Sequence, residues 1–150
     1  KQGQAAQPVI VSDIGSFRVL ICYEIIFPDF IAADNFRPDV LLALSNDAWF
    51  GQTAGPHQHF AQARMRAIEE GLPVIRVANT GISGAIDGYG RVLARTELAV
   101  ATVIDAPVPP ALEGTVYIQL RMFAPLLLLL VYLFMTLWLE LYHQRRNKDG

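Results

Sequence analysis

Residues 40–51 read VLLALSNDAWFG, and this stretch predicts how the chain folds. Residues 40–44 form a continuous apolar run between Pro38-Asp39 and the turn residues that begin at Ser45. A short apolar run without polar alternation is typical of a strand buried on both faces, as in a parallel sheet. The polar residues after it then lie at the carboxyl end of the sheet, where α/β folds place their ligands.

Further strand patterns lie on both sides of this stretch. Strands are predicted at residues 17–22 (FRVLIC), 74–78 and 99–104, and a hairpin is predicted from residues 82–86 and 91–95 around DGYG at 87–90. Because helical patterns separate several of these runs, the sequence indicates an α/β layered sheet.

Two helices are predicted between the strands. Pro28 suits the first turn of a short helix that extends to about Asn35. A longer helix is predicted over residues 57–70, ended by Gly71 and Pro73. Helical spacing predicts that its core-facing stripe consists of Ala61, Met65, Ile68 and Leu72.

Residues 122–139 (MFAPLLLLLVYLFMTLWL) contain no charged residue. At ~1.5 Å per residue, a helix over this segment is roughly 27 Å long, close to the ~30 Å hydrocarbon core of a bilayer. A buried core helix is the alternative, but the segment has no polar stripe. The sequence therefore predicts a transmembrane helix at 122–139.

The charges that flank this helix predict its orientation. Arg145, Arg146 and Lys148 follow it, whereas Arg121 is the only basic residue close before it. The positive-inside rule then places the C-terminus in the cytoplasm and residues 1–115 on the other side of the membrane. The predicted parts are a catalytic portion (1–106), a proline-containing linker (107–121), the span (122–139) and a basic cytoplasmic tail (140–150).

Composition excludes several classes of function. The chain is 53% hydrophobic and only 17% charged, and its net charge of −2 provides no electrostatic footprint for nucleic acid. A single cysteine permits neither an internal disulfide nor a cysteine zinc cluster. The histidines at 57, 59 and 143 are too few and too scattered to suggest a metal site, so no cofactor is expected.

Cys22 is the first candidate for chemistry. It ends an apolar strand, where a nucleophile is exposed at the sheet edge and neighbouring backbone N–H groups can hold an oxyanion. A lone cysteine in an apolar run can equally be a small core residue. The carboxylate of Glu24 disfavours a nearby thiolate, so this pair needs a base and a cationic group from elsewhere in the fold.

Residues 45–51 are the second candidate, because they follow the buried strand. Trp49 and Phe50 are suited to line an apolar pocket, although a turn with a hydrophobic plug has the same composition. Arg76, inside a predicted strand, is expected to pair with a carboxylate.

A Cys–His–Asn arrangement is a further alternative. It would use His57 or His59, with Asn46 or Asn79 as the residue that orients the imidazole. Both histidines lie where the helix is predicted to begin, so packing or capping explains them equally well.

The motifs, taken together, resemble a known family. They are Cys22-Tyr23-Glu24 after an apolar strand, SNDAWFG at 45–51, Gly55-Pro56 with Gln58-His59, ARMRAIEEGLP at 63–73, and Arg76 with Asn79-Thr80-Gly81. The run over residues 17–86 resembles the C-terminal half of the apolipoprotein N-acyltransferases, membrane members of the nitrilase (carbon–nitrogen hydrolase) superfamily.

The resemblance implies a fold and a set of site residues. The fold is the C-terminal half of a nitrilase-like α-β-β-α sandwich followed by one transmembrane helix. Cys22 is the nucleophile of a Glu–Lys–Cys triad, Tyr23 provides a backbone oxyanion contact, and Glu24 is a supporting carboxylate. Trp49 and Phe50 contact substrate. The triad Glu and Lys belong upstream of the cysteine, so residues 1–150 alone are expected to be inactive.

The resemblance also implies an activity and a location. A phospholipid acyl donor forms a thioester on the cysteine, and the N-terminal diacylglyceryl-cysteine of a bacterial apolipoprotein then takes the acyl chain. The implied location is the bacterial inner membrane, in a multi-pass protein with a periplasmic catalytic domain. Two alternatives remain open: a membrane-tethered amidase or nitrilase, and a non-catalytic half-domain.

Overall fold

The computed structural model describes residues 9–11, 15–28, 31, 36–121 and 123–148. Contacts divide the chain into two units, Lys1–Thr115 and Val116–Gly150. In the first unit the elements are β1 (Val9–Val11), β2 (Gly15–Ile21), η1 (Cys22–Ile26), β3 (Val40–Asn46), η2 (Ala48–Phe50), α2 (Gly55–Glu70), β4 (Val74–Asn79), β5 (Gly84–Ile86) and β6 (Val92–Arg95). The second unit holds α3 (Val116–Leu120) and α4 (Ala124–Lys148).

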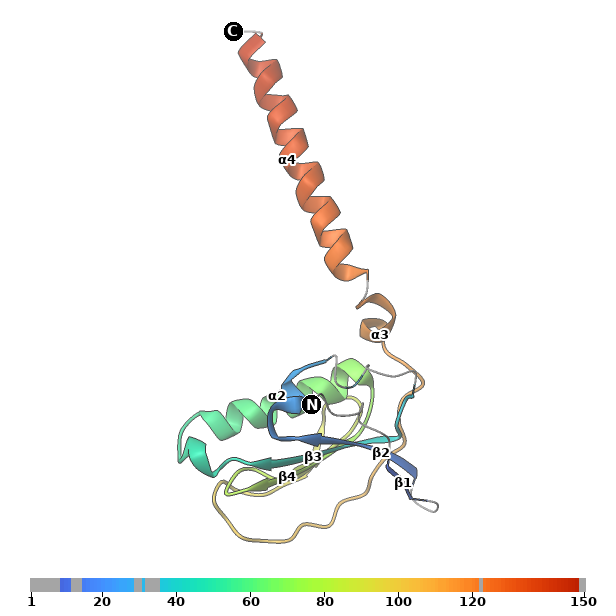
Figure 1. Ribbon diagram of the computed structural model, residues 1–150, viewed down its shortest axis with the longest axis vertical. Helices are drawn as coiled ribbons and strands as arrows, with labels where there is room; N and C mark the ends of the chain where they lie inside the picture. The colour runs from blue at the N-terminus through green and yellow to red at the C-terminus, as the bar shows by residue number, and fades with distance from the viewer. Residues whose placement is uncertain (1–8, 12–14, 29–30, 32–35, 122, 149–150) are drawn as a thin grey trace, which may run out of the picture. The chain divides into compact units, whose positions relative to one another are not determined.

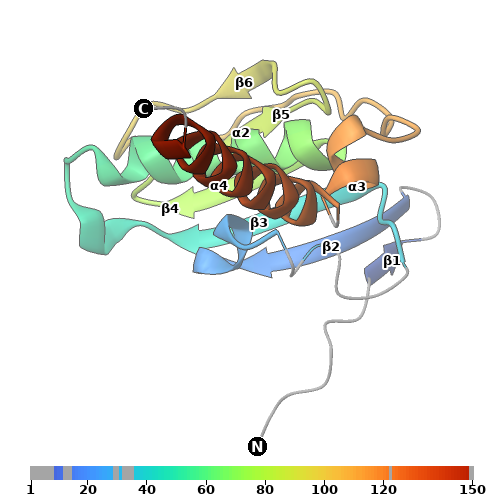
Figure 2. The same ribbon diagram turned by 90° about the horizontal axis from the view of Figure 1, so that it is seen from above.

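The first unit is built on one sheet with the strand order β1-β2-β3-β4-β5-β6 (Figure 2). β2, β3 and β4 are parallel, while β1, β5 and β6 join them in antiparallel pairs. The predicted α/β sheet and the hairpin of β5 and β6 are therefore confirmed.

The register of the parallel strands separates two faces. Leu20, Ala43 and Arg76 form one cross-strand row on the face that α2 covers (Figure 1). The neighbouring row, Ile21, Leu44 and Val77, points to the opposite face, as does the row Val19, Leu42 and Ile75. Ile21 and Val77 remain 53% and 51% exposed there, so this second face is apolar and only partly covered.

The segment after β6 runs along this second face without joining the sheet (Figure 1). The strand predicted at 99–104 is wrong, because the described part of the sheet ends at β6 and these residues pair with no strand. Apolar composition favours a strand, but a strand also needs an edge that supplies hydrogen bonds. The helix predicted from Pro28 to Asn35 falls largely outside the described residues.

The buried face of α2 differs from the predicted stripe. Ala61, Met65 and Ile68 are exposed, and of the predicted set only Leu72 is buried. The residues that are buried are Pro56, His59, Phe60, Ala63, Arg66, Ala67 and Glu70. The spacing of apolar residues predicted the wrong face of α2 because three of the side chains that face the core are polar. Two others are small alanines, which allow α2 to approach the sheet closely.

The two faces of α2 predict effects of different size for the same type of substitution. Ala63→Leu inserts a larger side chain into a fully buried position, so we expect it to lower the free energy of unfolding by about 1–3 kcal/mol. Ala61→Leu, on the exposed face of the same helix, should change that energy by about 0.5 kcal/mol or less. Thermal unfolding of the two variants measures the difference, and equal effects would contradict the observed orientation of α2.

Gly71 ends α2, as predicted. Its φ of 63° is the left-handed conformation common at helix C-termini, and its N–H donates to the carbonyl of Ala67. The Gly71 carbonyl accepts a 2.9 Å hydrogen bond from the N–H of Leu112. A Cβ at Gly71 would lie 2.9 Å from Cγ2 of Thr115, so the absent side chain lets the segment after β6 pack against the end of the helix.

In the second unit, α4 contains a segment suited to a membrane. Residues Pro125–Gln144 have a mean hydropathy of 1.9, and none of the side chains described in that stretch is buried. The length and composition of this helix are enough to cross a bilayer. One apolar C-terminal helix was predicted, and the structure confirms it.

Candidate active site

Cys22 lies at the turn that leads from β2 into η1. Strand β2 ends at Ile21, and Cys22 is partly exposed. Its φ is 54°, a left-handed value that side-chain-bearing residues rarely adopt and that costs on the order of 1–3 kcal/mol. Strained conformations of this kind recur where a nucleophile is presented at the end of a strand.

Glu24 is tied to the same turn. Its Oε2 accepts a 2.7 Å hydrogen bond from the N–H of Ile21, the residue before Cys22. Its carbonyl accepts a 3.1 Å hydrogen bond from the N–H of Phe27. The Glu24 carboxylate therefore braces the backbone that presents the cysteine.

Tyr23 belongs to a cluster of rings. Its ring centroid lies 5.4 Å from that of His59, 5.6 Å from that of Trp49 and 6.3 Å from that of Phe50. Trp49 and Phe50 stack on each other at 4.2 Å, and Trp49 is 62% exposed. The tertiary fold thus brings Trp49 and Phe50 beside the residue that follows Cys22.

A pocket of about 330 Å³ adjoins this cluster, and we call it the Tyr23 pocket. It is lined by Tyr23, Ile26, Phe50, Gly55, Gln58, His59 and Gln62. Trp49, in contrast, stands at the surface outside this lining.

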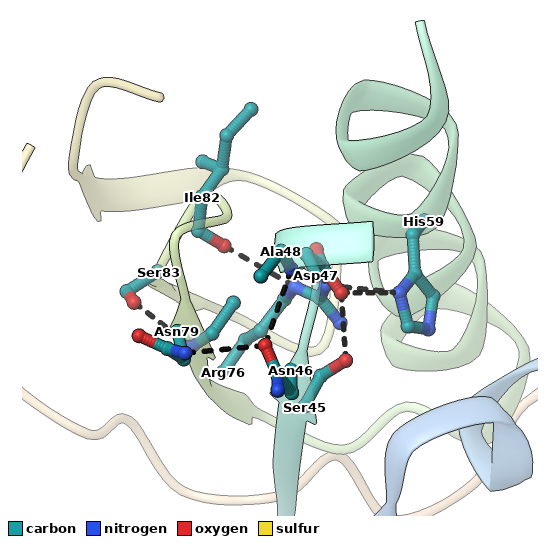
Figure 3. Close-up of polar contacts among 10 residues, drawn as sticks. Ser45, Asn46, Asp47, Ala48, His59, Arg76, Asn79, Ile82 and Ser83 are labelled. Atoms are coloured by element: carbon teal, nitrogen blue, oxygen red, sulfur yellow. Dashed lines mark hydrogen bonds and ion pairs between the residues drawn. The ribbon is translucent and has the colours of Figure 1, made fainter. Parts of the chain in front are cut away.

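His59 connects the ring cluster to a buried polar network centred on Asp47 (Figure 3). Its Oδ2 accepts a 2.6 Å hydrogen bond from Nη2 of Arg76, and its Oδ1 accepts a 2.7 Å bond from the hydroxyl of Ser45. Nδ1 of His59 lies 3.0 Å from the same Oδ1. Asp47 and Arg76 are each 1% exposed and His59 is 3% exposed. Arg76 therefore has the carboxylate partner that its place in a strand predicted.

The charges of this network support one another. Burial by itself raises the pKa of Asp47, but the hydrogen bond from Ser45, the charge of Arg76 and the contact with His59 together hold that pKa below its ordinary value. Burial lowers the pKa of Arg76, against the opposing effects of Asp47 and Cys22.

The two asparagines do not orient a histidine. Asn79 donates a 3.1 Å hydrogen bond to Oδ1 of Asn46, which also accepts from the N–H of Ala48. The polar partners of the His59 ring are Asp47 and Arg76, and His57 is exposed. Neither asparagine thus plays the part that a Cys–His–Asn arrangement gives it.

The sequence pattern placed Asp47 within the candidate segment 45–51 but did not single it out. The available signal was the pairing of an arginine inside an apolar strand with a carboxylate directly after the neighbouring strand, since parallel strands bring their carboxyl ends together. Among the residues that the structure describes, no group of three or more His, Cys, Asp or Glu side chains is placed to hold a metal ion.

Comparison with known proteins places this site in a family. The family model described as carbon-nitrogen hydrolase matches residues 1–117. The chain belongs to the carbon-nitrogen hydrolase family. A solved carbon-nitrogen hydrolase from Helicobacter pylori G27 shares the fold, with a TM-score of 0.54 and 18% identity over 63% of this chain and 40% of that one. The nitrilase-like fold that the motifs implied is confirmed.

Relatives within the carbon-nitrogen hydrolase family include two proteins named apolipoprotein N-acyltransferase. The one from Rhodopseudomonas palustris is 55% identical over 65% of this chain and 18% of its own length. The one from Brucella melitensis is 39% identical over 96% of this chain and 27% of its own length. The chain thus spans about a fifth to a quarter of these relatives, and the resemblance drawn from the motifs is confirmed.

Proposed function

We propose that the protein containing this chain transfers an acyl group from a phospholipid to the N-terminal amine of a diacylglyceryl-modified apolipoprotein. The observation that carries the proposal is the partly exposed Cys22 on a strained turn, next to a residue, Tyr23, that belongs to a ring cluster. The names and identities of the relatives from R. palustris and B. melitensis support it.

The proposed reaction has two half-reactions. The Cys22 thiolate attacks the ester carbonyl of the phospholipid, the ester C–O bond breaks, and the lysophospholipid oxygen leaves with a proton. The acyl group remains as a thioester. The amine of the apolipoprotein then attacks the thioester carbonyl, the C–S bond breaks, and one amine proton is released as the amide forms. Cys22 returns to its starting state without a metal or redox cofactor.

Each site residue has a proposed role in these two half-reactions. The backbone N–H of Tyr23 helps to hold the oxyanion of each tetrahedral intermediate. Glu24 supports the turn through its hydrogen bond to the N–H of Ile21. Trp49 and Phe50 contact acyl chains, for which each buried methylene contributes about 0.8 kcal/mol.

The apolar helix suggests where the reaction takes place. We propose that α4 crosses the bacterial inner membrane with its C-terminus in the cytoplasm, in a multi-pass protein whose catalytic domain is periplasmic. A site tethered to the membrane meets both lipid substrates without a search through solvent.

An acyl-transfer assay on the full-length protein tests the proposed function. The purified protein is incubated with phospholipid that carries a labelled acyl chain and with a diacylglyceryl-cysteine peptide. We expect labelled peptide and lysophospholipid in equal amounts, detected by mass spectrometry. Release of ammonia from simple amides, without labelled peptide, would instead identify a membrane-tethered amidase and overturn the proposal.

A further inference from the structure

Among the described residues, two atoms of the buried network are left without a hydrogen bond: Nε2 of His59 and Nη1 of Arg76. Of these two residues, His59 is the one that lines the Tyr23 pocket. The other ring nitrogen, Nδ1, is held 3.0 Å from the Asp47 carboxylate. His59 as a whole is 3% exposed, yet it lines the Tyr23 pocket. Leaving a buried polar atom unpaired is costly, so an unpaired Nε2 on a residue that lines a pocket points to a ligand that supplies the missing bond.

The contacts of Nδ1 bear on which bond Nε2 can make. Asp47 is ionised at neutral pH and accepts the hydrogen bonds of Ser45 and Arg76. Nδ1 of His59 lies 3.0 Å from Asp47 Oδ1 and 3.1 Å from Nη2 of Arg76, so it either donates to the carboxylate or accepts from the guanidinium. Nε2 is an acceptor in the first tautomer and a donor in the second. A ligand that carries both N–H and carbonyl groups satisfies either tautomer.

The residues of this chain that line the rest of the pocket are aromatic or neutral, with no cation for an anionic group. Tyr23 and Phe50 supply aromatic walls, and Gln58 and Gln62 supply neutral amides. Among the residues that line it, none is a lysine or an arginine, whereas phosphate recognition relies on such cations. The pocket is therefore poorly suited to a phospholipid headgroup and well suited to a peptide, whose backbone carries N–H donors and carbonyl acceptors.

We propose that the Tyr23 pocket binds the peptide end of the acyl acceptor and that His59 Nε2 makes a hydrogen bond with one of its backbone amide groups. The inference rests on the proposed function, because it divides the two substrates between different parts of the site. The peptide lies beside Tyr23, the residue after Cys22, and therefore next to the thioester that it must reach. The donor headgroup lies outside this pocket.

The variant His59→Asn isolates the role of Nε2. The Asn amide nitrogen occupies the place of Nδ1 and keeps a donor for Asp47, whereas the position of Nε2 becomes empty. We expect KM for a diacylglyceryl-cysteine peptide to rise about tenfold in the full-length protein, as for the loss of one buried hydrogen bond. The rate of lysophospholipid release in the absence of acceptor, which reports the first half-reaction, should stay within about twofold of wild type.

His57→Asn is the matched control. His57 is on the same helix, is exposed and does not line the pocket, so the same substitution there should leave both half-reactions unchanged. A second variant, Gln62→Trp, fills the pocket from an exposed position without touching the Asp47 network. It should raise the acceptor KM at least as much, and it tests the proposal even if His59→Asn is poorly folded.

The outcomes separate this inference from the proposed function. An unchanged acceptor KM in both His59→Asn and Gln62→Trp would overturn the pocket assignment, as would an equal loss in the first half-reaction or a rise in KM for the phospholipid. In those cases wild-type protein still transfers acyl groups, and the proposed function stands. If wild type itself makes no labelled peptide, the proposed function fails first.

Discussion

Replacing Cys22 with alanine should lower the rate of acyl transfer by the full-length protein by a factor on the order of 10³ or more, because no thioester can form. The measurement is the initial rate of N-acyl peptide formation, combined with mass spectrometry of the intact protein after incubation with phospholipid alone. Wild type should gain the mass of one acyl chain, and the variant should gain none.

The backbone at Cys22 provides a control for this experiment. Alanine and cysteine face the same steric penalty at a φ of 54°, so the thermal unfolding midpoint of the variant should match that of wild type. A loss of activity with an unchanged midpoint then reports the sulfur and not the fold. A variant that retains more than about a tenth of the wild-type rate would show that Cys22 is not the nucleophile.

Replacing Asp47 with alanine should produce the largest loss of stability. The substitution leaves Arg76 buried without its carboxylate and removes the partner of His59 Nδ1. Breaking a buried ion pair in this way costs about 3–5 kcal/mol, which thermal unfolding of the full-length protein in detergent should reveal as a fall in midpoint. Asp39→Ala is the matched control, since Asp39 is exposed and accepts its hydrogen bonds from Ser16; its cost should be about 1 kcal/mol or less.

The stabilisation by Asp47 should also depend on pH. The folded-state pKa of this carboxyl lies below its ordinary value of 3.8, so the folded state binds fewer protons than the unfolded state in the acid range. The contribution is therefore fully present at neutral pH and is lost as the pH falls through the folded-state pKa. The difference in stability between wild type and Asp47→Ala should shrink on acidification, and a constant difference down to pH 3 would contradict this account.

Local patterns were sufficient for much of the fold. Apolar runs predicted β3 and β4, Gly71 predicted the end of α2, and the hairpin of β5 and β6 followed from its glycine turn. These features depend on neighbours in the sequence, where backbone preference and burial act together. The strand predicted at 99–104 was wrong because its pairing depends on a free sheet edge, and nothing in a local window shows whether one exists.

The buried face of α2 shows a second limit. Periodicity of apolar side chains favoured Met65 and Ile68, yet His59, Arg66 and Glu70 are the residues that turn inward. Polar side chains can be buried when the tertiary structure supplies their partners, as Asp47 does for His59. A hydropathy pattern counts such residues as surface, since it contains no information about partners.

For the candidate site, the sequence alone determined the nucleophile candidate Cys22, the carboxylate Glu24, the aromatic pair Trp49 and Phe50, and the presence of an apolar helix. These follow from residue type and from the position of each residue beside a strand or within a run. Only the tertiary structure decided that Asp47, His59 and Arg76 form one network and that His59 lines a pocket beside Tyr23. The physical reason is that this network joins the end of β3, the interior of β4 and the helix α2, and contacts between such distant segments exist only once the sheet has formed.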